Sequence, residues 1–330
     1  MIGHADRSRH GRSSTQTMQE WLAVALLFVL ISFIAITPCL ASEPHTLVAK
    51  HLYDLQGPPG SPLSLPSDVV LDSSGRAYVV DGGNNRIAVF SSTGKWLYEI
   101  GRKGKQFNGM NGPVGIGISA DGILFVADRN NSRVLGFTLN GKLIQDIPLR
   151  SGKYSIHPID VAVSADGSRL FITGNNNHSL MVYTRDGGYL SQWGGEGVDE
   201  GQFRYPATLS LDGTGSIYVV DVLNTRVQKF SEDGRFLVQI GEWGVRPGNF
   251  YRPKGVAATS SGVVLVSDSY LNAIQVFSSD SRFRFQLLTD DPSRGFTTPS
   301  GLALGNNGLL YVCEMLANRV SVFQLDLPPP

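Results

Sequence analysis

The sequence predicts an all-β fold, a propeller of six four-stranded antiparallel blades, and three regularities along the chain predict it. Prolines recur at intervals of 45 to 48 residues, at Pro66, Pro113, Pro158, Pro206, Pro253 and Pro299. An acid stands fifteen residues after five of them, at Asp81, Asp128, Asp221, Asp268 and Glu314, and Gly174 takes this place in the third unit. Nine residues further on, every unit has an aromatic residue, at Phe90, Phe137, Tyr183, Phe230, Phe277 and Phe323. A repeat of this length is typical of propeller blades.

Each unit divides into four short strands, as the fourth unit illustrates. Its apolar or alternating segments run over residues 207–211, 216–220, 226–230 and 235–240. Turn residues separate them, among them Asp212-Gly213 and Asp233-Gly234. First strands repeatedly carry Gly or Ala, as at Gly115, Gly255 and Gly301. We therefore expect the first strand of each unit to be innermost, where only small side chains let backbones approach closely.

The two ends of the repeat region predict how the ring closes. The sixth unit ends after its third strand, at Phe323, and so lacks a fourth. The segment Leu52-Tyr-Asp-Leu55 resembles Leu97-Tyr-Glu-Ile100, the fourth strand of the first unit. We expect residues 47–56 to pair with the strand that ends at Phe323, which would leave no blade edge open to aggregation.

The first 41 residues are predicted to be a signal peptide or an N-terminal membrane anchor, and residues 42–330 the propeller. Residues 21–37 contain no charged side chain, and three arginines precede them, at Arg7, Arg9 and Arg12. We expect an exported chain that is periplasmic or extracellular, or that stays attached to the membrane through residues 21–37 if the segment is not cleaved.

Charge and cysteine content exclude several alternatives. The chain has 28 basic and 28 acidic residues, so it lacks the positive charge typical of nucleic-acid binders. Only Cys39 and Cys313 occur, and cleavage after Ala41 would leave one thiol, which cannot form an internal disulfide. Cys313 lies in an apolar strand pattern, and we interpret it as a small buried residue. We expect a monomer.

The motifs of these units resemble the NHL-repeat family of six-bladed β-propellers. The second unit shows them clearly, with Pro113-Val-Gly-Ile-Gly-Ile, then Gly122-Ile-Leu-Phe-Val-Ala-Asp128, then Asn131-Ser-Arg-Val-Leu-Gly-Phe137. The resemblance covers residues 46–323. The third unit departs from the pattern at Gly174 and Ser179, and the fifth at Ala273.

The acid and the arginine of the motif stand five residues apart across one turn, and we interpret them as structural. A carboxylate at that place can accept hydrogen bonds from turn N–H groups and pair with the guanidinium. The residues concerned are Asp81, Arg86, Asp128, Arg133, Asp221, Arg226, Asp268, Glu314 and Arg319.

Strand alternation predicts where a partner would bind. The loops between second and third strands, here called the 2–3 loops, share one face with the connections between blades. In the last three units these loops carry apolar residues, and the connections carry aromatic residues with arginines, a combination common on binding surfaces. The candidate binding residues are Val222, Leu223, Tyr270, Leu271, Met315, Leu316, Arg204, Tyr205, Tyr251 and Arg252.

Three classes of function follow from these observations. The first is a non-catalytic scaffold that binds a protein or peptide. The second is a metal-dependent enzyme, because the resemblance extends to peptidyl-hydroxyglycine amidating lyases, which hold zinc with several histidines. Beyond residue 41 only four histidines remain, without metal-ligand spacing; they are His45, His51, His157 and His178. The third is RNA binding, as in cytoplasmic relatives, which the neutral charge and the export signal oppose.

The first strands also place two acids, Asp68 and Asp160, two residues after a repeat proline. We expect both side chains to face the central channel, where they could hold a cation such as Ca²⁺, although a water-filled channel is the favoured interpretation. The sequence shows no Ser-His-Asp set and no phosphate loop, and it does not predict a pair of neighbouring carboxylates. We expect no cofactor.

Overall fold

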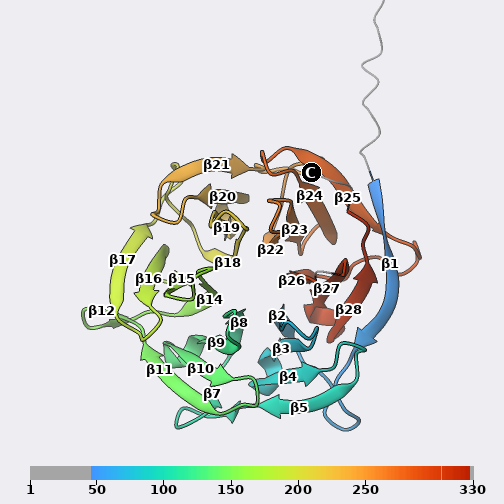
Figure 1. Ribbon diagram of the computed structural model, residues 1–330. Helices are drawn as coiled ribbons and strands as arrows, with labels where there is room; N and C mark the ends of the chain where they lie inside the picture. Colours follow the sequence, from blue (N-terminus) through green and yellow to red (C-terminus); the bar gives the residue numbers. More distant parts are fainter. Residues whose placement is uncertain (1–45, 306, 328–330) are drawn as a thin grey trace, which may run out of the picture. The chain divides into compact units, whose positions relative to one another are not determined.

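The repeat prolines begin the innermost strand of every unit, in a computed structural model that describes residues 46–305 and 307–327. Proline lacks an N–H donor, so the first residue of a strand is one of the few places where it fits in a sheet. These strands lie nearest the centre of the ring (Figure 1). They are β2 (Pro66–Leu71), β8 (Pro113–Ile118), β14 (Pro158–Val163), β18 (Pro206–Leu211), β22 (Pro253–Ala258) and β26 (Pro299–Leu304).

The second and third strands of each unit are central in their sheets and nearly completely buried. Five of the second strands end at the motif acid. They are β3 (Ala77–Asp81), β9 (Ile123–Asp128), β15 (Arg169–Gly174), β19 (Ile217–Asp221), β23 (Val264–Asp268) and β27 (Leu309–Glu314). The third strands are β4 (Arg86–Phe90), β10 (Arg133–Thr138), β16 (Ser179–Thr184), β20 (Arg226–Phe230), β24 (Ala273–Phe277) and β28 (Arg319–Gln324).

The outermost strands are more exposed than the central ones, because only one of their faces covers the core. They are β1 (Thr46–Leu55), β5 (Trp96–Ile100), β11 (Leu143–Pro148), β17 (Tyr189–Gly194), β21 (Phe236–Ile240) and β25 (Phe283–Thr289). Four short strands lie in blade connections, β6 (Arg102–Lys103), β7 (Gly109–Met110), β12 (Arg150–Ser151) and β13 (Tyr154–Ser155).

Four of the 2–3 loops are single 3₁₀ turns, which end in a residue with a positive φ. The turns are η1 (Gly82–Asn84), η2 (Arg129–Asn131), η3 (Val222–Asn224) and η4 (Met315–Ala317). Asn85 and Asn318 follow η1 and η4 with φ of 57° and 54°, a left-handed conformation that asparagine tolerates better than most residues. No α-helix occurs in the described residues.

The hydrogen-bonded sheets show antiparallel blades and the predicted closure. Four sheets contain four strands each, and one contains eight in the order β22-β23-β24-β25-β1-β28-β27-β26. Residues Lys50 to Leu55 of β1 pair antiparallel with β28, so the predicted pairing of the N-terminal segment is confirmed. Thr46 to Ala49 pair in parallel with β25, which the sequence did not predict. Because of this second pairing, the strands β22 to β25 and the strands β26 to β28 with β1 form one continuous sheet. The sheets alone therefore do not fix the number of blades.

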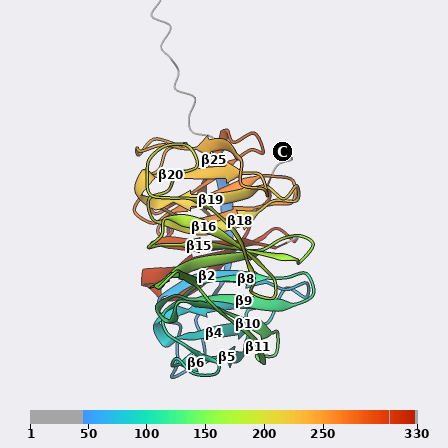
Figure 2. The same ribbon diagram turned by 90° about the vertical axis from the view of Figure 1, so that its left-hand side faces the viewer.

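The apolar core lies between neighbouring units, as expected when sheets are packed face to face around an axis. The described residues form six buried clusters, each drawn mainly from two units that are neighbours in the ring. Phe203 and Phe250, from the blade connections, are fully buried against Phe230 and Phe277. Seen from the side, the ring of sheets is thinner along its axis than across it (Figure 2).

Two predictions about single segments have different outcomes. Cys313 is buried, as predicted, and burial raises the pKa of its thiol well above the usual value. The predicted signal or anchor, residues 1–41, lies outside the described residues. Within the described residues, no helix has the length and apolar character to cross a membrane.

Candidate binding face and central channel

Each motif acid fastens a blade connection to a 2–3 loop. Asp221 Oδ1 accepts a hydrogen bond from the backbone N–H of Arg204 at 2.7 Å, seventeen residues earlier. Equivalent bonds run to Asp81 from Ser64, to Asp128 from Asn111, to Asp268 from Tyr251 and Arg252, and to Glu314 from Thr297. The 2–3 loops and the connections therefore lie on one side of the ring, called the connection face below.

The motif arginine completes this buried network. Arg226 Nε donates to Asp221 Oδ2 at 2.9 Å, and its other nitrogens donate to Gln239 Oε1 and to the carbonyl oxygens of Asp199 and Gln202. The same pairing joins Arg86 to Asp81, Arg133 to Asp128 and Arg319 to Glu314. The acids and arginines therefore form buried contacts between loop, connection and strand, and their purely structural role stays a prediction.

The third unit replaces this network by a different one. Gly174 and Ser179 supply neither charge, and Asn176 Oδ1 instead accepts the N–H of His157 at 2.8 Å. The Asn177 side chain occupies the space beside Gly174, where a Cβ would lie only 2.0 Å from Asn177 Oδ1. An amide from the loop has therefore taken over part of the role of the missing acid.

A cavity of about 530 Å³ lies on the connection face, where the innermost strands begin. Its lining includes the first residues of strands from all six units, among them Ser67, Val114 and Ile159. Half of the ten candidate binding residues line it, namely Tyr205, Val222, Leu223, Arg252 and Met315. The sequence thus predicted part of the lining of a cavity whose existence it did not predict.

The apolar residues of the 2–3 loops divide into exposed and buried members. Leu223, Tyr270 and Leu316 are 47%, 60% and 65% exposed. Tyr251 and Tyr270 stack, with ring centroids 4.1 Å apart. Val222 does not fit the expected exposed tip, because its side chain packs into the core cluster between the fourth and fifth units and is only 8% exposed.

The remaining candidate residues lie on the same face, outside the lining of the cavity. Arg204 is exposed beside Tyr205, whose ring packs edge-on against His178 at 5.1 Å. Leu271 is half-buried, and its N–H donates to Asp268.

The sequence did not single out two cations in the lining, Arg129 of η2 and Lys254 of β22. Lys254 directly follows a repeat proline, a place where the other units carry Ser67, Val114, Ile159, Ala207 and Ser300. The one charged residue among six equivalent positions was a signal in the sequence that could have identified Lys254 as a candidate site residue. Its neighbours are Arg252 and a largely apolar wall.

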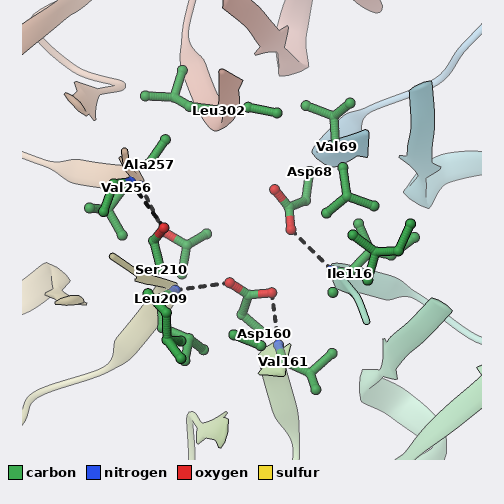
Figure 3. Close-up of a pocket in the computed structure, with 18 of the residues that line it drawn as sticks. Asp68, Val69, Ile116, Asp160, Val161, Leu209, Ser210, Val256, Ala257 and Leu302 are labelled. Atoms are coloured by element: carbon green, nitrogen blue, oxygen red, sulfur yellow. Dashed lines mark hydrogen bonds between the residues drawn. The ribbon is translucent and has the colours of Figure 1, made fainter. Parts of the chain in front are cut away.

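A second cavity, of about 330 Å³, lies in the central channel, and Asp68 and Asp160 point into it (Figure 3). Both side chains are buried, 7% and 3% exposed. Asp68 Oδ2 accepts the N–H of Ile116 at 3.0 Å, and Asp160 Oδ2 that of Leu209 at 2.9 Å. Each acid therefore ties its strand to the innermost strand of the next unit.

The two carboxyl groups lie close enough to influence each other, so the channel holds a carboxylate pair that the sequence analysis did not predict. Burial raises the pKa of Asp68, and burial together with repulsion from Asp68 raises the pKa of Asp160. Glycines make room for both groups. A Cβ on Gly115 would lie 2.3 Å from Asp160 Oδ1, and one on Gly301 would lie 2.4 Å from Asp68 Oδ1.

The described residues of the channel and the described histidines fit neither calcium nor zinc. Calcium needs six to eight oxygen ligands, whereas at least three of the four carboxylate oxygens here already accept backbone N–H groups. His51 contacts Asp54 at 3.0 Å, and His178 accepts the N–H of Tyr205. In residues 46–305 and 307–327, no three His, Cys, Asp or Glu side chains form a cluster that could hold a metal ion.

Comparisons with known proteins agree with the fold. The family model described as NHL repeat matches residues 63–90, 110–137 and 250–277. No curated protein matches the sequence. Among solved structures, a catalytically inactive virginiamycin B lyase from Staphylococcus aureus with quinupristin is similar, with a TM-score of 0.59 and 17% identity over 82% of this chain and 84% of that one.

Two further solved structures are similar over most of their length. A gluconolactonase from Xanthomonas campestris has a TM-score of 0.63 and 14% identity, over 86% of this chain and 95% of that one. The hydrazine synthase of Kuenenia stuttgartiensis has a TM-score of 0.58 and 11% identity, over 81% and 97%. At such low identities these likenesses show the fold alone.

Proposed function

From the premise that this chain is an NHL-repeat β-propeller, we propose that it is a non-catalytic, extracytoplasmic scaffold. It binds a protein or peptide on its connection face. We count the eight-stranded sheet as two blades, since it contains two innermost strands, β22 and β26. The propeller then has six blades, in agreement with the six repeats of the sequence. The apolar segment at residues 21–37 supports export, with or without retention as an anchor.

The observation that carries this proposal is the group of exposed apolar and aromatic side chains around a cavity on one face. Leu223, Tyr270 and Leu316 lie on loops that the buried acids fasten to a rigid ring. Ordered loops lose little entropy on binding, and aromatic residues contribute strongly to interfaces. The net charge of zero lacks the positive surplus that is typical of nucleic-acid binders.

The test is affinity capture of a partner from the native envelope with the full-length chain. The variant Leu223→Ser, Tyr270→Ser, Leu316→Ser should lose the partner. A matched control is Leu97→Ser, Ile144→Ser, Leu237→Ser, which removes three side chains of 40–43% exposure from the outermost strands β5, β11 and β21. Equal capture by both variants would contradict the proposed face.

An enzymatic role is the second candidate, supported by the channel carboxylates and by the enzyme names of the similar structures. Two buried carboxyl groups with raised pKa values can act as acid and base in a reaction. Elemental analysis of the purified chain tests the metal-dependent form of this candidate. Stoichiometric zinc or calcium would favour it over the scaffold.

A further inference from the structure

The cavity on the connection face is positively charged. Arg129, Arg252 and Lys254 line it, and no Asp or Glu is among its lining residues. Buried arginines elsewhere have a carboxylate partner, as Arg86 has Asp81 and Arg226 has Asp221. The three cations of the cavity form no ion pair within the described part of the chain, so their charge is available to a ligand.

Two of these cations are partly withdrawn from water. Arg129 Nε is shielded from solvent and has no hydrogen-bond partner among the described residues. Burial, and then the charge of Arg252, lowers the pKa of Lys254. A desolvated cation without a partner is unfavourable. An anion bound in the cavity would relieve this cost at both residues.

The rest of the lining determines what else the ligand must contain. Val114, Ile159, Ala207 and Val222 form apolar walls. The hydroxyl groups of Ser67 and Thr208 are already engaged, as donors to the carbonyl oxygens of Val114 and Lys254. A volume of about 530 Å³ lies in the range of sites for small organic ligands or short chain ends. An apolar group that carries a negative charge fits this lining.

We propose that the cavity binds the C-terminal carboxylate of the partner peptide, together with apolar side chains at its last positions. This inference rests on the proposed function. Of the two ends of a chain, the N-terminal ammonium would be repelled by three cations, and the C-terminal carboxylate would be attracted. The exposed Tyr205, Leu223 and Tyr251 at or beside the cavity offer contacts to the residues that precede the carboxylate. Capture of a terminal carboxylate is a recurring mode of peptide recognition.

The experiment uses the full-length chain in mild detergent and two pools of N-acetylated octapeptides. The last four positions are randomised among all amino acids except cysteine, and the pools differ only in a free carboxylate or an amide at the C-terminus. Enriched members are identified by mass spectrometry and resynthesised with a fluorophore in both forms, and their affinities are measured by fluorescence anisotropy. Oleate is tested as a competitor without a peptide.

We expect enrichment of peptides with apolar C-terminal residues from the acid pool, and at least tenfold weaker binding of the amide forms. Lys254→Met and Arg252→Gln should each weaken the acid form by about tenfold. The control Lys103→Met removes an exposed cation of β6 that is not part of the lining and should change nothing.

Several results would overturn the inference. These are equal binding of acid and amide forms, no enrichment from either pool, or oleate binding in the absence of any enriched peptide. Partner capture distinguishes this failure from that of the proposed function. If Lys254→Met keeps the envelope partner while the triple serine variant loses it, the docking face stands and the terminal carboxylate is wrong.

Discussion

Replacing Asp221 with alanine tests whether the repeated acid is a structural residue. Its carboxylate is fully buried and accepts hydrogen bonds from the Arg204 N–H, the Asn224 amide and Arg226 Nε, at 2.7 to 2.9 Å. The substitution leaves the guanidinium of Arg226, itself 7% exposed, without its anion. Breaking a buried pair in this way costs about 3–5 kcal/mol, a large part of the ~5–15 kcal/mol stability of a typical domain.

The assay is equilibrium unfolding in urea, followed by tryptophan fluorescence, with Trp193 packed against Phe230 as a reporter of this region. Asp186→Ala, on an exposed turn, is the control and should lie within ~0.5 kcal/mol of the wild type. The double variant Asp221→Gly, Arg226→Ser reproduces the third unit and should cost less than the sum of its single changes. An unchanged midpoint for Asp221→Ala, or strictly additive single changes, would refute the structural reading of the motif.

Three further predictions concern the channel and the closure of the ring. Asp68→Asn removes an acid whose pKa is raised in the folded chain, and a raised pKa makes wild-type stability fall as the pH rises above about 4. Between about pH 4 and 7, the free energy of unfolding of the wild type should fall by up to ~1.4 kcal/mol per pH unit because of this acid, and the variant should lack that fall. Parallel pH profiles of unfolding for wild type and variant would argue against it. Gly301→Ala places a Cβ 2.4 Å from Asp68 Oδ1 and 2.6 Å from a backbone oxygen; we expect a loss of roughly 1–3 kcal/mol, and no change in melting temperature would be inconsistent with close approach. Deleting residues 46–55 removes the strand that lies between β25 and β28, so each of them keeps one neighbour and gains an open edge; size-exclusion chromatography should show aggregation, and a monodisperse monomer would mean that closure is dispensable.

The features that the sequence predicted well are those that a single unit specifies. The repeat proline marks the start of the innermost strand, because it cannot donate a hydrogen bond in the sheet interior. The acid and the arginine, five residues apart, meet across one turn in the same unit. The missing fourth strand of the last unit also predicted its replacement by β1, since an open edge needs a partner.

The features that the sequence did not predict depend on side chains from different units. Asp68 and Asp160 belong to the first and third units, and the glycine of the second unit, Gly115, leaves the space that Asp160 occupies. In the sequence, Gly115 indicated only close approach of backbones. Likewise, Lys254 was visible as a charge, whereas the absence of a described carboxylate beside it is a property of the assembled face.

By itself, the sequence determined the strands of each unit and their order, because the same pattern of prolines, acids and aromatic residues recurs along the chain. It also determined the closure, because the last unit lacks a fourth strand and the N-terminal segment resembles one. The tertiary structure alone decided that two acids share the channel and that three cations, which form no ion pair with any described residue, share one cavity. The physical reason is that charge and desolvation act through space, between residues that the ring brings together and the repeat keeps apart.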